Sequence, residues 1–248
     1  MTISVPRSDP VPTTKEFRPY RSRLFRIVEA QHRISTDRLV DELAAQDVLE
    51  RLIEEVKPTV PAEARGLHHL LGTPFRYGYE KPTRFRQAHD RPGIFYGSEA
   101  QRTAVAETAY WRMRFFAASP GMKLPETTLE HWAFSVTVKV ERALDLTEPP
   151  LDQWRASWTD PRDYGPCQKL AQQARRIGAQ LIRYEAVRDP PDGRNAALFD
   201  PTAFLKPVPN SERSWHFRFR GNKLTAFAAQ PSAERHDFTF EQFGLVAP

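Results

Sequence analysis

A short apolar run, a glycine turn and a long run of helix-forming residues follow one another between positions 93 and 116, and this stretch constrains the fold most strongly. Residues 94–96 are β-branched or aromatic, which is the composition of a short buried strand. Gly97 and Ser98 interrupt that run, and a serine at this place can cap a following helix. Residues 99–116 are mostly good helix formers, so the stretch predicts a strand–turn–helix unit.

Glu107 lies inside this predicted helix among small and aromatic neighbours. Thr103 stands one turn before it on the same face, and Trp111 stands one turn after it. A carboxylate in this setting, with Tyr96 just before the turn, can orient a substrate hydroxyl or stabilise a developing positive charge. Because most glutamates are surface residues, a solvated helix glutamate is the alternative interpretation.

Strands and helices are also predicted on both sides of this unit. In residues 132–140 large apolar side chains alternate with small or polar ones, which makes this the clearest half-buried strand. Residues 1–20 are polar and proline-rich, and we expect a mobile tail there and a single domain over 21–248. The other predicted elements are strands at 23–29, 181–184 and 196–199, a hairpin within 214–228, and helices at 36–57, 62–71 and 167–179.

The charge balance is mildly basic, with 36 lysines and arginines against 31 acidic residues, a net charge of +5. Such a surface suits an anionic small molecule, an acidic protein or nucleic acid, and does not choose between them. No run of basic residues marks a nucleic-acid-binding arm. No apolar run approaches the roughly 20 residues of a membrane span, and the first residues lack the apolar core of a signal peptide, so we expect a cytoplasmic location.

Several kinds of catalytic site have no support in the sequence. The single cysteine, Cys167, excludes an internal disulfide and a multi-cysteine metal site, and its place in a predicted helix indicates a packing role. The seven histidines lack the spacing of a zinc site, so no metal is expected. Neither a phosphate-binding glycine loop nor the Gly-x-Ser-x-Gly motif of serine hydrolases occurs.

Residues 72–91 read as a loop in which arginines alternate with aromatic residues. Arginine binds phosphate in a bidentate manner, and aromatic rings stack on bases. A nucleotide site is therefore a reasonable prediction here, and a basic surface loop is the alternative. The residues concerned are Phe75, Arg76, Tyr77, Tyr79, Arg84, Phe85, Arg86 and His89.

An ordered set of short blocks resembles the RES domain family. The resemblance runs from about Leu24 to about Pro201, with the blocks in the family's order; each block is weak alone, and the ordered set is fairly specific. The blocks are Leu24–Ile27, Thr83–Arg86, Gly93–Ser98, Arg102–Glu107, Arg183–Asp189 and Gly193–Asn195.

This resemblance implies an α+β fold, a mixed-sheet core with flanking helices that is similar to the ADP-ribosyltransferase toxins. RES proteins are toxins of type II toxin–antitoxin pairs that degrade NAD+. They cleave the nicotinamide–ribose bond by phosphorolysis or hydrolysis and release nicotinamide with ADP-ribose phosphate or ADP-ribose. The implied partner is an antitoxin with a helix-turn-helix region, whose C-terminal part blocks the site. A homodimer within such a complex is left open, and no cofactor, membrane contact or direct nucleic-acid binding is implied.

The family is named after an arginine, a glutamate and a serine. The glutamate corresponds to Glu107, and the arginine corresponds to Arg26 or Arg84. A tyrosine at the end of the central strand corresponds to Tyr96. The family's serine usually stands in a Tyr-x-Ser-x-Arg segment, where this sequence has Ala186, and this departure puts the role of that position in doubt.

The resemblance also suggests roles for these side chains. Arg26 and Arg84 would bind the pyrophosphate of NAD+, and the nicotinamide ring would stack on Tyr96. Glu107 would stabilise the oxocarbenium character that builds up at the ribose, directly or through a ribose hydroxyl. We therefore expect Glu107, Arg84 and Tyr96 to be catalytic. Inorganic phosphate as the attacking group would need a further cation, for which the candidates are Arg86 and Arg188.

Two other functions remain open at this point. The same fold could transfer ADP-ribose to a macromolecule, because the acceptor is not encoded in the donor site. The chain could also be a basic binding module that has lost activity, with Ala186 as the trace of that loss. The presence of Arg84, Tyr96 and Glu107 together argues against this last interpretation.

Overall fold

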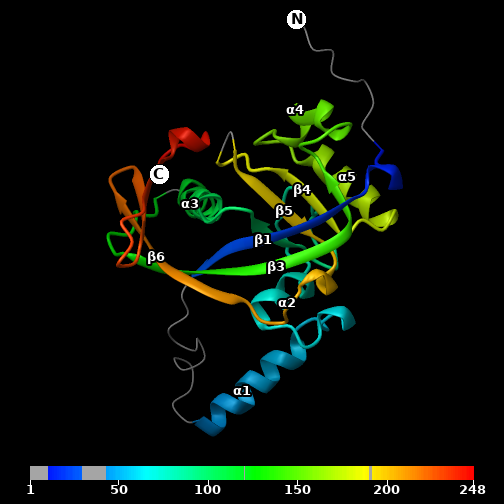
Figure 1. Cartoon of the computed structure of the whole chain (residues 1–248). Helices are drawn as coiled ribbons and strands as arrows, with labels where there is room; N and C mark the ends of the chain where they lie inside the picture. Colours follow the sequence, from blue (N-terminus) through cyan, green and yellow to red (C-terminus); the bar gives the residue numbers. More distant parts are fainter. Residues whose placement is uncertain (1–10, 30–42, 120, 190–191) are drawn as a thin grey trace, which may run out of the picture.

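One mixed sheet of eight strands forms the core of the computed structural model, which describes residues 11–29, 43–119, 121–189 and 192–248 (Figure 1). This confirms the predicted α+β class with a mixed-sheet core and flanking helices. The strands are β1 (Arg18–Glu29), β2 (Phe95–Ser98), β3 (Leu129–Asp145), β4 (Leu181–Glu185), β5 (Arg194–Leu198), β6 (Asn210–Arg220), β7 (Lys223–Ala228) and β8 (Arg235–Thr239). The helices are α1 (Leu43–Val56), α2 (His69–Arg76), α3 (Gln101–Ala117), α4 (Arg155–Trp158) and α5 (Gly165–Arg176).

The strand order is β1-β2-β5-β4-β3-β6-β7-β8, and β1 also pairs with β3. The strands β1, β2, β5, β4 and β3 therefore form a closed circuit of hydrogen-bonded neighbours, from which β6, β7 and β8 extend. Among the strands that the structure describes, only β3 and β4 pair in parallel. The hairpin predicted within residues 214–228 is confirmed as β6 and β7.

The long strand β3 holds this arrangement together because it has partners along both edges. It pairs with β1 on one edge, and with β6 and then β4 on the other. Phe134, Val136, Val138 and Val140 are buried on one of its faces, as the alternation over residues 132–140 predicts. The observed strand is longer than that alternation, because its ends gain partners that no local pattern reveals.

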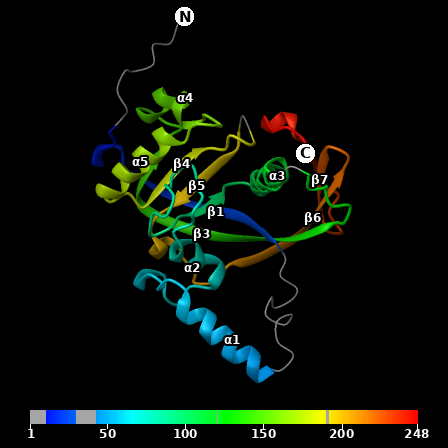
Figure 2. The same ribbon diagram turned by 180° about the vertical axis from the view of Figure 1, so that it is seen from behind.

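Helices cover the two sides of the central strands (Figures 1 and 2). The helices α3 and α5 lie on one side, and α2 lies on the other with α1 beyond it. A buried cluster that includes Ala109 and Met113 of α3 packs against Trp215 and Phe217 of β6. Another buried cluster, on the α2 side, joins Leu71 and Phe75 to side chains of β1, β2 and β3. No helix among the described residues is long and apolar enough to cross a bilayer.

The predicted strand–turn–helix unit is present as β2 followed by α3, with one difference. The helix begins at Gln101, and Ala100 is the N-cap without a side-chain hydrogen bond. Ser98 does not cap this helix, because its hydroxyl donates to Asn195 across the sheet. Gly97 lies close to β1, since a Cβ at this position would come within 3.0 Å of the Leu24 side chain.

The N-terminal prediction needs correction where the structure describes it. Residues 14–20, expected as the end of a mobile tail, form a 3-10 turn (Thr14–Glu16) and the start of β1. The side chains of Thr13 and Glu16 cap this turn reciprocally, and Arg18 pairs with Ala143 of β3. Residues 1–10 lie outside the described residues. The strands β1 and β8 belong to one sheet.

The helices before the site also differ from the prediction. Residues 62–71 do not form one helix, since Gly66 has a φ of 81° and separates a 3-10 turn (Ala62–Ala64) from α2. The helix α2 extends into the stretch expected to be a loop, and His68 caps it by accepting a hydrogen bond from the backbone of Leu70. The first residues of the helix predicted at 36–57 lie outside the described residues.

Candidate functional site

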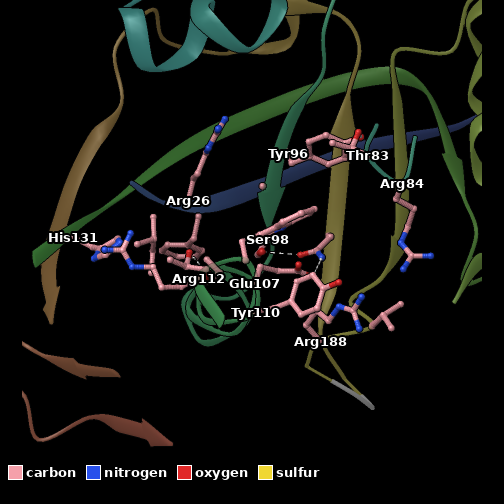
Figure 3. Close-up of a pocket in the computed structure, with 18 of the residues that line it drawn as sticks. Arg26, Thr83, Arg84, Tyr96, Ser98, Glu107, Tyr110, Arg112, His131 and Arg188 are labelled. Carbon is pink, nitrogen blue, oxygen red and sulfur yellow. Dashed lines mark hydrogen bonds between the residues drawn. The ribbon is translucent and has the colours of Figure 1, made fainter. Parts of the chain in front are cut away.

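A cavity of about 530 Å³ lies between α3 and the strands β1, β2 and β5 (Figure 3). This volume is within the range of roughly 300–1,000 Å³ that small-molecule sites occupy. Its polar lining includes Arg84, Ser98, Glu107, Tyr110, Arg188 and Asn195. The cavity therefore brings together Arg84, Tyr96, Glu107 and Arg188, four residues that the sequence places far apart.

Glu107 projects from α3 into this cavity and is held from the sheet. The side-chain amide of Asn195 donates a hydrogen bond of 2.8 Å to its Oε1. Burial raises the pKa of Glu107, while the Asn195 hydrogen bond and the charges of Arg188 and Arg84 act in the opposite direction. The carboxylate is therefore not the solvated glutamate of the alternative interpretation, and neighbouring groups stabilise its charged form against the effect of burial.

The amide of Asn195 is in turn held by Ser98. The Ser98 hydroxyl donates to Asn195 Oδ1 at 2.7 Å, and the two residues are directly opposite each other in the antiparallel pair of β2 and β5. On the other side of β5, Asn195 is paired with Tyr184 of β4. Ser98, Asn195 and Tyr184 therefore form a row across three strands, and all three line the cavity beside Glu107.

Arg84 enters the cavity from the loop before β2. Its Nη1 donates to the carbonyl oxygens of Trp158 at 2.8 Å and Asp160 at 2.9 Å. Its guanidinium carbon lies 4.7 Å from the centroid of the Tyr164 ring, and the residue is 9% exposed. These contacts fix the guanidinium at one end of the cavity, in position for an anionic group.

Arg188 follows β4 and lies close to Arg84 at the same end (Figure 3). Its guanidinium carbon is 3.6 Å from the centroid of the Tyr110 ring, and Nη2 donates to the carbonyl of Pro161 at 3.3 Å. Buried cations of this kind interact with charged partners more strongly than exposed ones. Two buried arginines and a carboxylate thus share one cavity.

Tyr96 connects β2 to the loop that carries Arg84. Its hydroxyl oxygen lies 2.7 Å from the hydroxyl of Thr83 and accepts a hydrogen bond from the backbone of Phe85 at 3.3 Å. Burial raises the pKa of Tyr96 to about 12, so the phenol stays protonated at neutral pH. Its ring lines the cavity, while its hydroxyl fixes the residues on either side of Arg84.

Arg26 does not point toward Glu107, although its position on β1 borders the cavity. Figure 3 shows its side chain directed away from Ser98 and Glu107. Its guanidinium carbon lies 5.2 Å from the Phe95 ring, which belongs to the buried cluster on the α2 side. Strand alternation explains this, because Phe25 and Ile27 pack with the cluster on the α3 side and Arg26 must face the opposite way.

Arg86 is not part of the cavity lining. It is 3% exposed and donates hydrogen bonds to the carbonyl oxygens of Tyr79, Gln87 and Lys81. These bonds make it a support for the loop rather than a ligand for phosphate. Of the arginines predicted to bind substrate, Arg84 and Arg188 therefore meet Glu107, and Arg26 and Arg86 do not.

Ala186, which stands where the family usually has serine, lies just outside the cavity lining. Its backbone amide donates to the carbonyl of Gly193 and its carbonyl accepts from Asp189, so it shapes the turn between β4 and β5. The residue is fully buried. Its methyl group lies close to Gly193, since a Cβ at Gly193 would come within 2.9 Å of the Ala186 Cβ.

The sequence reasoning missed several residues of the cavity. The sequence predicts Ser98 as a helix cap, and Ser98 and Asn195 otherwise enter only as members of matching blocks. The far end of the cavity carries Arg112 and His131, for which no local signal existed. Arg112 shares its helix face with Ala104, Thr108 and Phe115, which also line the cavity at helical spacing.

Among the described residues, no group of histidine, cysteine and acidic side chains is arranged to hold a metal ion.

Comparison with known proteins adds the family. One similar solved structure is the M. tuberculosis MbcT-MbcA toxin-antitoxin complex, with 12% sequence identity and a TM-score of 0.45, over 81% of this chain and 86% of that one. No curated protein gives a significant match. The model of the RES domain matches residues 60–220, which span α2 to β6 and most of the cavity lining. The chain therefore belongs to the RES domain family.

Proposed function

We propose that the protein is a toxin that cleaves the nicotinamide–ribose bond of NAD+, with inorganic phosphate or water as the acceptor. The single observation that carries this proposal is the buried Glu107 carboxylate, which shares one cavity with the buried cations Arg84 and Arg188. NAD+ has a matching distribution of charge, because the nicotinamide ring that is bonded to the ribose is cationic and the pyrophosphate is anionic. Membership of the RES domain family supports the same conclusion.

Each residue would have a separate part in the reaction. Arg84 and Arg188 would bind the pyrophosphate and leave the ribose carbon near Glu107. The carbon–nitrogen bond would then break, and its electron pair would go to the nicotinamide nitrogen, which becomes neutral. The Glu107 carboxylate would stabilise the positive charge that develops on the ribose, and a phosphate or water oxygen would form the new bond.

The state of Glu107 sets the pH range of this reaction. The carboxylate must be ionised to stabilise a cation, and burial raises its pKa above the ordinary value. Turnover should therefore fall on the acid side at a higher pH than an exposed glutamate would produce. Asn195, Arg188 and Arg84 oppose that shift by favouring the ionised carboxylate.

The test is product analysis with pure protein that has been freed of any bound partner. NAD+ should disappear with release of nicotinamide. Glu107→Gln should lower the rate of NAD+ loss by at least about 1,000-fold, while its melting curve shows a folded protein. Reactions with and without phosphate identify the acceptor. Intact NAD+ under both conditions would overturn the proposal.

The same experiment in cell extract addresses transfer to a macromolecule. Labelled NAD+ should give label in small molecules only. Label attached to protein or nucleic acid would mean that the protein transfers ADP-ribose to a macromolecule instead of degrading NAD+, with the same residues.

We also infer a protein antitoxin as the partner, with a helix-turn-helix region. The rim of the cavity supports a protein partner, because Trp111 and Phe115 are 45% and 54% exposed beside it on α3. A small protein encoded next to this chain should co-purify with it and inhibit NAD+ loss. Trp111→Ser combined with Phe115→Ser should weaken that complex at least tenfold, and an unchanged affinity would move the interface elsewhere.

A further inference from the structure

We propose that Ser98 and Asn195 are a positioning pair that holds the carboxylate of Glu107 in one orientation toward the substrate ribose. The inference rests on the proposed function and extends it to the orientation of the reacting carboxylate. Both lie on strands, whereas Glu107 lies on a helix, so the pair connects the sheet to the reacting group.

The hydrogen bonds allow only one arrangement of the Asn195 side chain. A carboxylate accepts hydrogen bonds and cannot donate them, so the amide nitrogen must face Glu107, as it does at 2.8 Å. The amide oxygen then faces Ser98, whose hydroxyl donates to it at 2.7 Å. The carboxylate, which only accepts, sets this orientation, and the hydroxyl of Ser98 stabilises it by donating to the amide oxygen.

The sheet makes this pair rigid. Ser98 and Asn195 are opposite each other in neighbouring strands, and they are 4% and 3% exposed. Side chains that are packed in this way keep one rotamer. Asn195 in turn fixes Oε1 of Glu107, whereas no hydrogen bond to Oε2 is found among the described residues. That second oxygen remains for the ribose.

The pair also supports the charge that the reaction needs. Burial favours the neutral form of Glu107, and the hydrogen bond from Asn195 is the main opposing influence. A hydrogen bond to a charged group has a typical strength that corresponds to a factor of about 10 to 100 in an equilibrium or a rate. This range is the effect expected when the donor is removed.

The experiment compares Asn195→Leu and Ser98→Ala with wild type across a pH series. Asn195→Leu should lower kcat about 10- to 100-fold with KM for NAD+ within about twofold, because the donor acts on the reacting carboxylate. Its acid limb should move to higher pH, since burial then raises the pKa of Glu107 with less opposition. Ser98→Ala should have the same effect but smaller, and Ser98→Thr, which keeps a hydroxyl, should restore activity.

A matched control exists in another part of the sheet. Thr225 is 6% exposed and its hydroxyl donates to the carboxylate of Asp237 at 2.6 Å, outside the Glu107 cavity. Thr225→Val removes a buried hydroxyl bond of the same kind and should leave kcat and the pH profile unchanged. A loss in Thr225→Val equal to that in Ser98→Ala would show a general effect of stability and overturn the proposal.

Other outcomes are equally decisive. If Asn195→Leu keeps the wild-type kcat and the acid limb of its pH profile does not move, the proposal that this pair positions Glu107 is overturned. If Asn195→Leu does not fold, the serine variants decide through loss in Ser98→Ala and recovery in Ser98→Thr. If wild type leaves NAD+ intact, the proposed function fails, and carbon NMR titration of Glu107, assigned with Glu107→Gln, still tests the pair. A higher pKa in Ser98→Ala supports it, and an unchanged pKa overturns it.

Discussion

The two sides of the central strands place buried arginines in different surroundings. On the α3 side, Arg84 and Arg188 contact backbone carbonyls and aromatic rings and share a cavity with Glu107. On the α2 side, Arg26 lies over Phe95, and its enclosed Nη1 has no hydrogen-bond partner among the described residues. Burial lowers the pKa of Arg26, although an arginine side chain stays charged in proteins.

This difference shows that burial of a cation does not by itself identify a functional site. A buried charge contributes to chemistry only where a partner charge or a ligand can face it. The α3 side offers a carboxylate and an open cavity, whereas the α2 side offers an apolar cluster. The four predictions below test that contrast, beginning with the largest expected effect.

Arg84 should be the arginine on which turnover depends most. Arg84→Met should lower kcat/KM for NAD+ about 100-fold, because a charged hydrogen-bond donor to the pyrophosphate is lost. Arg84→Lys should recover part of the activity by keeping the charge. Steady-state kinetics with a parallel melting curve make the measurement, and activity within twofold of wild type in Arg84→Met would contradict the assignment.

Arg86 should matter for stability instead of binding. Arg86→Met removes three hydrogen bonds to carbonyl oxygens of the loop and should lower the free energy of unfolding by about 2–3 kcal/mol. Below its melting temperature the variant should keep the wild-type KM for NAD+. Denaturation in urea gives the first quantity. A specific rise in KM with unchanged stability would return Arg86 to the substrate site.

Glu107 should lower the stability of the fold as the pH rises. Its pKa in the folded protein is above the ordinary value, so the folded state binds more protons and loses stability as the pH passes upward through that pKa. Glu107→Gln should therefore melt at a higher temperature than wild type at neutral pH. The difference should disappear in acid, below the pKa of the unfolded chain. Equal melting temperatures at every pH would show that the carboxylate is not desolvated.

Arg26 should give the smallest change in activity. Arg26→Leu replaces a buried charge by an apolar side chain and should raise the free energy of unfolding by about 1 kcal/mol, with NAD+ turnover within about twofold of wild type. Urea denaturation and initial rates give both values. A loss of turnover as large as that in Arg84→Met would mean that the contrast between the two sides is wrong.

Local sequence predicts part of the cavity lining. The order of β-branched residues, glycine and helix formers predicts β2 and α3, with Glu107 inside that helix. The density of arginine and aromatic residues offers Arg84 among the other residues of its loop, and the resemblance to the RES domain family singles out both side chains. These features depend on neighbours in the chain, which is the range over which propensity and periodicity carry information.

Other parts depend on contacts between distant segments. The resemblance to the RES domain family offers Arg26 as a substrate-binding arginine, and strand periodicity alone does not say which face of β1 carries α3. Ser98 and Asn195 are 97 positions apart, and only the register of β2 against β5 brings them together. The same register hid the role of Ser98, since its neighbours in sequence suggested a helix cap.

The closed circuit of strands also limits which edge of the sheet can pair with the sheet of another molecule. Because β1 is paired on the side that would otherwise be free, the sheet presents β8 as its terminal strand. That strand is short and contains Arg235, His236 and Asp237, and charged side chains on an edge strand discourage pairing with the edge of another molecule. A single apolar substitution in this five-residue strand, far from Glu107 in sequence, should therefore favour edge-to-edge aggregation without touching the cavity lining.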